Sequence, residues 1–446
     1  MLKREDNERL TRVGPGTPMG TLMRKYWMPA LLSSELEADG APVRVKILGE
    51  RLLAFRDSRN RIGLIDEFCA HRRTSLFYGR NEDCGIRCIY HGWKYDVTGR
   101  CVDLPTEPPG STYISKIKLT SYPTVELGGV LWAYLGEGTP PAPPKFEWTQ
   151  LEPARRQVCR NLVECNWLQT LEGGIDSAHA SFLHSVVSDS TKRPGLRGLW
   201  TTGPVMRDEV VMTSYGHLYT ALRELDEKRT WAKVYHYVAP ISTFFPFELP
   251  DGEHFQPQIN GNHYLPMDDE NTMIFCWIAR YDGEPLSDEE KAGLEKFNGR
   301  GPTEIGPDFR KLRNSDINYT IDRKVQKEET FSGIDGINNQ DQCVQESMGR
   351  IVDRSKEHLS ETDAAIIATR RLLLRLVRNP NAVPPGVEPT YYKMRATEKI
   401  IDTGSHWGHL MTNFLEPEDL REVLDAAPKT PKKRAATASK SREAAQ

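Results

Sequence analysis

Two short segments each pair a cysteine with a histidine, and both residue types are strong metal ligands. Cys69 and His71 are separated by one residue, and Cys88 and His91 follow after a further sixteen residues. Two such pairs on facing loops predict a metal centre with two thiolates and two imidazoles. A zinc ion with four ligands is one interpretation. A [2Fe–2S] cluster, with both cysteines on one iron and both histidines on the other, is the second.

The order and surroundings of these ligands favour the iron–sulfur cluster. The order is Cys-His followed by Cys-His, whereas a zinc finger places two cysteines before two histidines. The flanking sequence indicates short strands, and Gly92 and Trp93 directly follow His91, which is typical of a tight, shielded site. The sequence therefore predicts that this pattern of residues holds a [2Fe–2S] cluster.

Asp176, His179 and His184 form a second candidate centre. Residues five apart on a regular helix point about 140° apart, so both histidines reach one metal only where the helix ends, kinks or bulges. Two histidines and one carboxylate form the facial triad of non-haem iron(II) oxygenases, with positions open for O₂ and substrate. The alternative is two unrelated histidines on an amphipathic helix, but the upstream cluster pattern favours the metal.

Together these motifs resemble the oxygenase (alpha) subunits of Rieske non-haem iron aromatic-ring oxygenases. The matching patterns are Cys69-x-His71-x₁₆-Cys88-x₂-His91-Gly92-Trp93 and Asp176-x₂-His179-x₄-His184. The segment 346–359 is similar to the branch of phthalate dioxygenases and O-demethylases. The resemblance covers about residues 18–425 and implies two cofactors, a Rieske [2Fe–2S] cluster and mononuclear Fe(II). One departure is Arg73, because the family commonly has glycine there.

The resemblance also assigns roles to single residues. It implies Asp341 as the carboxylate ligand of the mononuclear iron, with Asp335 and Glu346 as alternatives. Asp176 would not bind iron; it would contact His179 and form an electron-transfer bridge to His91 of the partner subunit. Asn166 matches a polar position on the same helix and is included as a catalytic candidate, although an ordinary helix-surface amide is the alternative.

The implied activity is a mono- or dioxygenase that oxidises an aromatic carboxylic acid with O₂. Ring dihydroxylation, as in phthalate 4,5-dioxygenase, and O-demethylation of a lignin-derived methoxy-aryl acid such as dehydrodivanillate both stay open. A bidentate arginine would suit the carboxylate. Candidate substrate contacts, each with a purely structural alternative, are Arg207, Arg223, Phe245 and Trp277. Two other functions are a non-catalytic Rieske electron carrier and a zinc-stabilised binding protein.

The chain lacks the sequence signatures of a reductase. No G-x-G-x-x-G motif follows a predicted strand, and no plant-type C-x₄-C-x₂-C run occurs. The resemblance therefore implies a separate NAD(P)H-dependent reductase, with or without a ferredoxin. It also implies a homotrimer or homohexamer in which electrons cross between subunits.

Composition limits the other possibilities. Lys and Arg total 59 and Asp and Glu total 62, which leaves a net charge of −3 and disfavours nucleic acid as the main partner. No apolar stretch is long enough to span a membrane, and residues 1–6 lack an apolar signal region, so we expect a cytoplasmic protein. Eight cysteines in 446 residues do not indicate a disulfide scaffold.

The elements that position these motifs suggest an α+β protein. Period-two alternation near Val43 and close turns predict an all-β Rieske module over 41–136, after an N-terminal arm over 1–40 that contains a short helix at 21–27. A Pro-rich linker over 137–145 then leads to a catalytic domain of helices on an antiparallel sheet over 146–427. In that domain we expect a mostly helical segment at 166–184 and strands at 210–215, 231–238 and 272–278. A disordered basic tail over 428–446 completes the chain.

Overall fold

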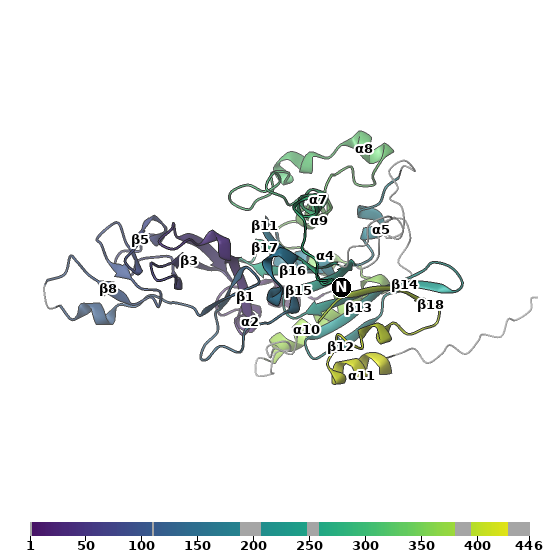
Figure 1. Ribbon diagram of the computed structural model, residues 1–446, viewed down its shortest axis with the longest axis horizontal. Helices are drawn as coiled ribbons and strands as arrows, with labels where there is room; N and C mark the ends of the chain where they lie inside the picture. Colours follow the sequence, from purple (N-terminus) through teal and green to yellow (C-terminus); the bar gives the residue numbers. More distant parts are fainter. Residues whose placement is uncertain (1, 109–110, 188–206, 248–257, 380–393, 427–446) are drawn as a thin grey trace, which may run out of the picture.

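The alternating residues from Val43 onward form strands, as their period of two predicts. The computed structural model describes residues 2–108, 111–187, 207–247, 258–379 and 394–426. Its N-terminal module contains β1 (Trp27–Leu32), β2 (Val43–Ile47), β3 (Glu50–Arg56), β4 (Ile62–Asp66), β5 (Arg80–Glu82), β6 (Gly85–Arg87), β7 (Lys94–Tyr95), β8 (Cys101–Asp103), β9 (Thr124–Leu127) and β10 (Val130–Tyr134). Figure 1 shows this module at one end of the molecule and the larger mixed region at the other.

The strands of the module form three antiparallel sheets, in the orders β1-β10-β9, β2-β3-β4 and β5-β6-β7-β8. β1 lies before the predicted boundary at residue 41, yet it pairs with β10, with Met28 opposite Ala133. The short helix predicted at 21–27 occurs earlier, as α2 (Pro18–Met23), because Thr17 accepts a hydrogen bond from the Gly20 amide and Pro18 takes the first helical position. Trp27 therefore begins a strand.

The second region is built on an eight-stranded antiparallel sheet. The strand order is β11-β17-β16-β15-β14-β13-β12, and β18 also pairs with β14. The strands are β11 (Arg156–Val163), β12 (Val210–Thr213), β13 (Gly216–Glu224), β14 (Arg229–Val238), β15 (Ser242–Phe247), β16 (Gln258–Pro266), β17 (Thr272–Arg280) and β18 (Thr397–Asp402). The three strands predicted here are thus present as β12, β14 and β17, and the last two are longer than predicted.

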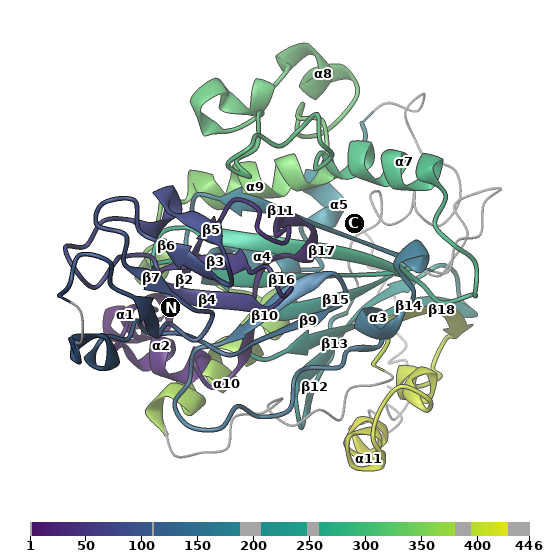
Figure 2. The ribbon, with the colours of Figure 1, turned by 60° about the vertical axis from the view of Figure 1, so that its left-hand side comes forward.

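Helices cover this sheet and hold the N-terminal segment against it. They include α1 (Arg4–Thr11), α3 (Glu147–Gln150), α4 (Trp167–Ile175), α5 (Ala180–Leu183), α7 (Asp288–Asn298), α8 (Arg323–Glu328), α9 (Ile337–Ser347), α10 (Ala364–Arg378) and α11 (Pro417–Asp425). α4 packs on β15 and β16 and against α9, whereas α10 packs on β13. Figure 2 shows α7 and α9 along one edge of the sheet and α11 beyond the other edge, at β12.

This arrangement confirms the predicted fold class, an all-β module joined to a helix-on-antiparallel-sheet region. Residues 137–145 contain neither helix nor strand, as expected of a linker. The predicted basic tail at 428–446 lies outside the described residues. None of the helices in the described ranges has the length and apolar character needed to cross a bilayer.

Candidate metal centres and active-site cavity

The two Cys–His loops have the same backbone hydrogen-bond pattern. The Cys69 amide donates to the Thr74 carbonyl at 2.9 Å, and the Cys69 carbonyl accepts from the Arg73 amide at 2.9 Å. In the second loop, the Cys88 amide donates to the Trp93 carbonyl at 2.8 Å, and the Cys88 carbonyl accepts from the Gly92 amide at 3.0 Å. Each loop thus closes back on its own cysteine and presents the thiol and imidazole from a fixed frame.

The four predicted cluster ligands differ in how deeply their side chains are buried. The thiols of Cys69 and Cys88 are buried, whereas His71 is exposed and its ring centroid lies 4.5 Å from that of His91. Trp93 stacks on the His71 ring, with centroids 4.5 Å apart. Thiols inside and imidazoles outside match a cluster with one sulfur-ligated and one histidine-ligated iron. The donor set therefore fits the [2Fe–2S] group.

The shared loop pattern explains why Arg73 is unusual. Arg73 occupies the position equivalent to Gly92, and both have positive φ, +59° and +75° respectively. Glycine adopts this conformation without steric cost, whereas arginine does not. The Arg73 guanidinium ion-pairs with Asp66 at 3.1 Å and lies over the Phe68 ring at 5.0 Å, contacts that hold the side chain in place.

His179, His184 and Asp341 converge on one point. Their ligand atoms all lie within 4.8 Å of one another. The Nε2 atoms of the two histidines are 3.2 Å apart, and Asp341 Oδ1 is 3.1 Å from His184 Nε2 and 3.5 Å from His179 Nε2. The other two carboxylates considered lie elsewhere: Asp335 pairs with Arg313, and Glu346 accepts hydrogen bonds from Tyr319 and the Glu164 amide.

A break in the helix brings the two histidines together. α4 ends at Ile175, and the short α5 has His179 as its N-cap and His184 as its C-cap. His179 and His184 therefore lie at the two ends of a short helix. A helix end is one of the geometries that let two residues five positions apart reach one metal. Two further contacts orient the rings: His184 Nδ1 lies 2.6 Å from Gln340 Oε1, and His179 Nδ1 lies 3.7 Å from Asp176 Oδ2. Each ring thus presents its Nε2 to the shared point.

The charge of this site suits a cation. Burial lowers the pKa of His179, but the carboxylates of Asp176 and Asp341 outweigh burial and raise it to about 10. Burial likewise raises the pKa of Asp341, yet His184 and His179 outweigh burial and hold it well below its ordinary value. A proton on His179 thus offsets the negative charge of the two carboxylates, as a bound divalent metal would. Two imidazoles and one carboxylate are a donor set that fits iron(II).

Two glycines let α4 approach its neighbours closely enough to form this site. A Cβ at Gly174 would lie 1.8 Å from Tyr264 Oη on β16, and one at Gly173 would lie 2.3 Å from Gln345 Nε2 on α9. A larger residue at Gly173 would separate α4 from α9, which carries Asp341, and one at Gly174 would clash with the sheet beneath α4.

Asn166 caps α4 and does not line the cavity. Its Oδ1 accepts from the Leu168 amide at 3.1 Å, and its Nδ2 donates to the carbonyls of Thr11 and Asp269 at 2.9 and 2.7 Å. The structure thus gives the Asn166 amide a capping role, which uses its donors and acceptor away from the histidines.

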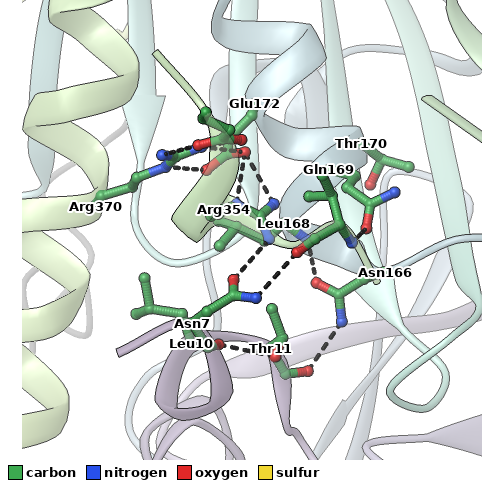
Figure 3. Close-up of polar contacts among 12 residues, drawn as sticks. Asn7, Leu10, Thr11, Asn166, Leu168, Gln169, Thr170, Glu172, Arg354 and Arg370 are labelled. Atoms are coloured by element: carbon green, nitrogen blue, oxygen red, sulfur yellow. Dashed lines mark hydrogen bonds and ion pairs between the residues drawn. The ribbon is translucent and has the colours of Figure 1, made fainter. Parts of the chain in front are cut away.

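A buried charge network fixes the other side of α4 (Figure 3). Glu172 accepts hydrogen bonds from Arg354 at 2.9 and 3.1 Å and from Arg370 at 2.6 and 2.9 Å. Arg354 also donates to Asn7 of α1 at 3.1 Å. Burial raises the pKa of Glu172, but the two guanidinium groups outweigh burial and lower it. This network ties the N-terminal helix and the helix leading to His179 into one unit.

A hollow with both polar and apolar walls opens at the iron-site histidines. It has a volume of about 150 Å³. Its floor comes from alternate residues of adjacent strands and its roof from α4, α5 and α9. The lining includes Asp176, His179, His184, Asp341, Asn161, Lys233, Tyr235, Phe245, Asn260, Asn262, Tyr264, Ile274, Cys276, Asn298 and Arg300.

Of the four predicted substrate contacts, the structure places Phe245 in this lining. Trp277 faces the opposite side of the sheet and stacks on Trp148, with centroids 5.0 Å apart. Arg207 is exposed and pairs with Glu209, while Arg223 is buried beneath α5 and donates to Ser181 at 3.3 Å. These last three do not line the cavity. The sequence reasoning missed Gln340 and Arg300, since neither belongs to a motif with its own spacing signal.

Comparison with known families matches both regions of the chain. Residues 26–123 match the family described as Rieske [2Fe-2S] domain, and residues 133–430 match the one described as LigXa C-terminal domain like. A solved structure of dicamba monooxygenase bound to dicamba shares the fold, with a TM-score of 0.57 and 18% identity over 81% of this chain and 99% of that one.

Curated relatives match over most of their length. The chain is 38% identical to the 3-chlorobenzoate-3,4-dioxygenase oxygenase subunit of Comamonas testosteroni, over 89% of this chain and 96% of the relative. It is 39% identical to the phthalate 4,5-dioxygenase oxygenase subunit of Pseudomonas putida, over 84% and 86%. Identity to the 5,5'-dehydrodivanillate O-demethylase oxygenase subunit of Sphingobium sp. (strain NBRC 103272 / SYK-6) is 33%, over 84% and 80%. With both centres and both family matches in one chain, this protein belongs to the Rieske non-haem iron oxygenases, as an oxygenase component.

Proposed function

We propose that this oxygenase component oxidises a single-ring aromatic carboxylic acid, by dihydroxylation of the ring. The observation that carries the proposal is the cavity of about 150 Å³ that opens at His179, His184 and Asp341. An apolar cavity of about this volume in another protein holds one benzene molecule, so the size suits one ring better than the linked rings of a biaryl acid. The most similar curated relatives reported above are named for 3-chlorobenzoate and phthalate.

Different residues of the chain would hold the two cofactors and contact the aromatic ring. Cys69, His71, Cys88 and His91 would hold the [2Fe–2S] cluster, and His179, His184 and Asp341 would hold the iron. When bound, the cluster supplies electrons and the iron supplies the chemistry of O₂ activation. Phe245, Tyr264 and Ile274 give the ring an apolar surface in the cavity.

We also propose that electrons pass between subunits of a homotrimer or homohexamer, by way of Asp176. The strands that carry the cluster loops lie at the far end of the molecule from α5 (Figure 1), and His71 is exposed on that end. Asp176 lines the cavity and lies beside His179, so it is placed to receive electrons from His91 of the partner subunit, as the resemblance implies.

Oxygenase components of multicomponent systems receive their electrons from a reductase or ferredoxin. We propose an NAD(P)H-dependent reductase as the source here and the cytoplasm as the location. All eight cysteines are free thiols, which suits a reducing compartment.

Turnover of a panel of acids with a surrogate reductase tests the proposal. The panel contains phthalate, benzoate, 3-chlorobenzoate and methoxylated benzoates, and products are identified by mass. Ring dihydroxylation adds both oxygen atoms and two hydrogens and yields a dihydrodiol, whereas O-demethylation releases formaldehyde and leaves a phenol. Release of formaldehyde as the main outcome would favour O-demethylation, the reaction for which the 33% identical relative is named. Failure to oxidise any acid, with both metal centres filled, would refute the proposal.

A further inference from the structure

Arg300 stands out among the residues that line the cavity. α7 ends at Asn298, and its C-cap Gly299 turns the chain with a φ of +66°. The Arg300 amide then donates to the Glu295 carbonyl at 3.0 Å. This turn places Arg300 in the cavity wall, with 7% of its surface exposed. The loop after α7, and not a strand of the sheet, therefore positions Arg300.

Three other buried arginines have a carboxylate partner, whereas Arg223 has none within the described ranges but lies outside the cavity lining. Arg354 and Arg370 pair with Glu172, and Arg160 pairs with Glu35. Within the described ranges, no ion pair joins Arg300 to an aspartate or glutamate. Glu295, a carboxylate whose charge acts on Arg300, accepts a hydrogen bond from Gln157 at 2.5 Å.

Two thiols and the Glu295 carboxylate act on the Arg300 guanidinium. It lies against Cys276, which is paired across β17 and β11 with Cys159. Sulfur is a weak hydrogen-bond acceptor, so Cys276 leaves most of the five donors of this side chain without a strong acceptor. A buried cation without a matching anion is costly, and the cavity is the open side from which an anion can reach it.

Lys233, the other cation in the lining, differs in this respect. Its Nζ lies 3.8 Å from Glu398, so a carboxylate already balances its charge. The lining also carries neutral amides, those of Asn298, Asn262 and Asn260. The acidic residues of the lining belong to the iron site.

We propose that Arg300 binds the carboxylate of the substrate and thereby selects aromatic acids over neutral aromatics. The inference rests on the proposed function and adds the residue that recognises the acid group. A planar guanidinium can hold a carboxylate through two parallel hydrogen bonds. With the acid group held at Arg300, the ring lies along the apolar floor toward His179 and His184, and Arg300 sets which ring edge faces the iron site.

The test compares a charged ligand with its neutral ester in the assembled holoenzyme. Binding of phthalate and of dimethyl phthalate is measured by calorimetry for wild type, Arg300→Gln and Arg300→Lys. Loss of a charge-assisted, bidentate contact should weaken phthalate binding by about 10- to 100-fold. Ester binding should change little, and Arg300→Lys should regain part of the affinity because it restores the charge.

Arg229→Gln is the matched control, because Arg229 is an exposed arginine of β14 that pairs with Asp226 and lies outside the cavity lining. It should bind phthalate as wild type does. Cluster absorbance, iron content and the melting temperature establish that each variant is folded; if Arg300→Gln does not fold, the acid-to-ester ratio is read from Arg300→Lys.

Equal losses for acid and ester in Arg300→Gln would assign it a structural role and overturn the inference, as would unchanged phthalate binding or no binding to wild type. The two proposals fail separately. If wild type forms no product from any acid but Arg300→Gln selectively loses phthalate binding, the proposed reaction fails and the binding role stands. If products form and Arg300→Gln keeps a normal KM, the binding role fails alone.

Discussion

Replacement of Glu172 by glutamine should destabilise the region that carries the iron site. Glu172 accepts four charge-assisted hydrogen bonds from two arginines, and Arg354 and Arg370 are 0% and 5% exposed. In Glu172→Gln, Arg370 keeps Glu357, but the charge of Arg354 keeps only the amide oxygen of Asn7. Removal of one partner from a buried ion pair costs roughly 3–5 kcal/mol.

The melting temperature of the holoprotein, followed by circular dichroism, measures this loss. At roughly 2 °C per kcal/mol for a large domain, the expected decrease is about 6–10 °C. Glu357→Gln is the matched control: Arg370 then keeps Glu172, and Glu357 is more exposed, so its decrease should be smaller.

A second readout follows from the position of Glu172 on α4, the helix that leads to His179. Iron content should fall in Glu172→Gln, while cluster absorbance stays constant because the cluster loops belong to the other module. A melting temperature within about 2 °C of wild type would show that the network contributes little and would refute the reasoning.

Four further outcomes are expected. Gln340→Ala removes the acceptor that orients His184, so iron affinity in a metal titration should fall about 10- to 100-fold; unchanged affinity would contradict the orienting role. Asp176→Asn should keep both metals yet slow substrate-dependent reoxidation of the cluster in stopped flow, and loss of iron would instead make Asp176 a ligand. Cys88→Ser should abolish the visible spectrum of the cluster, and a spectrum that survives would place the cluster elsewhere. Burial lowers the pKa values of His217, His236 and His263 to about 3, 4 and 3, against 6.5 when exposed, so the unfolded state binds more protons. The free energy of unfolding should therefore be highest above pH 6.5 and fall by up to about 1.4 kcal/mol per pH unit for each histidine on acidification toward pH 4. A urea midpoint that stays constant over that range would contradict this prediction.

Most of the residues proposed as metal ligands could be singled out because their spacing is local. Cys69 and His71 share one loop, and His179 and His184 lie on either side of a four-residue helix. Asp341 required the resemblance to a family, since no spacing rule connects it to His184 across more than 150 residues. The same distance hid Gln340, whose role depends on how α9 packs against α4 and α5.

The residues that line the cavity were harder to predict because they depend on which face of a strand meets the cavity. Cys276 and Trp277 are neighbours on β17, so their side chains point to opposite faces, and the structure places Cys276 in the cavity. Trp277 is the aromatic residue of this pair that the sequence favours as a substrate contact, but it packs in the core against Trp148. Arg300 follows the end of a helix and a glycine in the left-handed conformation. At such a position neither the helix period nor the strand period predicts the direction of the side chain.

The link between Asn7 and Arg354 has a consequence for biosynthesis. The two residues are 347 positions apart, so Asn7 leaves the ribosome long before its partner is made. Contacts of such sequence separation form late and slowly. α4 therefore has no complete support while the chain is being synthesised, and iron should be loaded only after release of a nearly complete chain, whereas the cluster loops, whose ligands span positions 69 to 91, can close early.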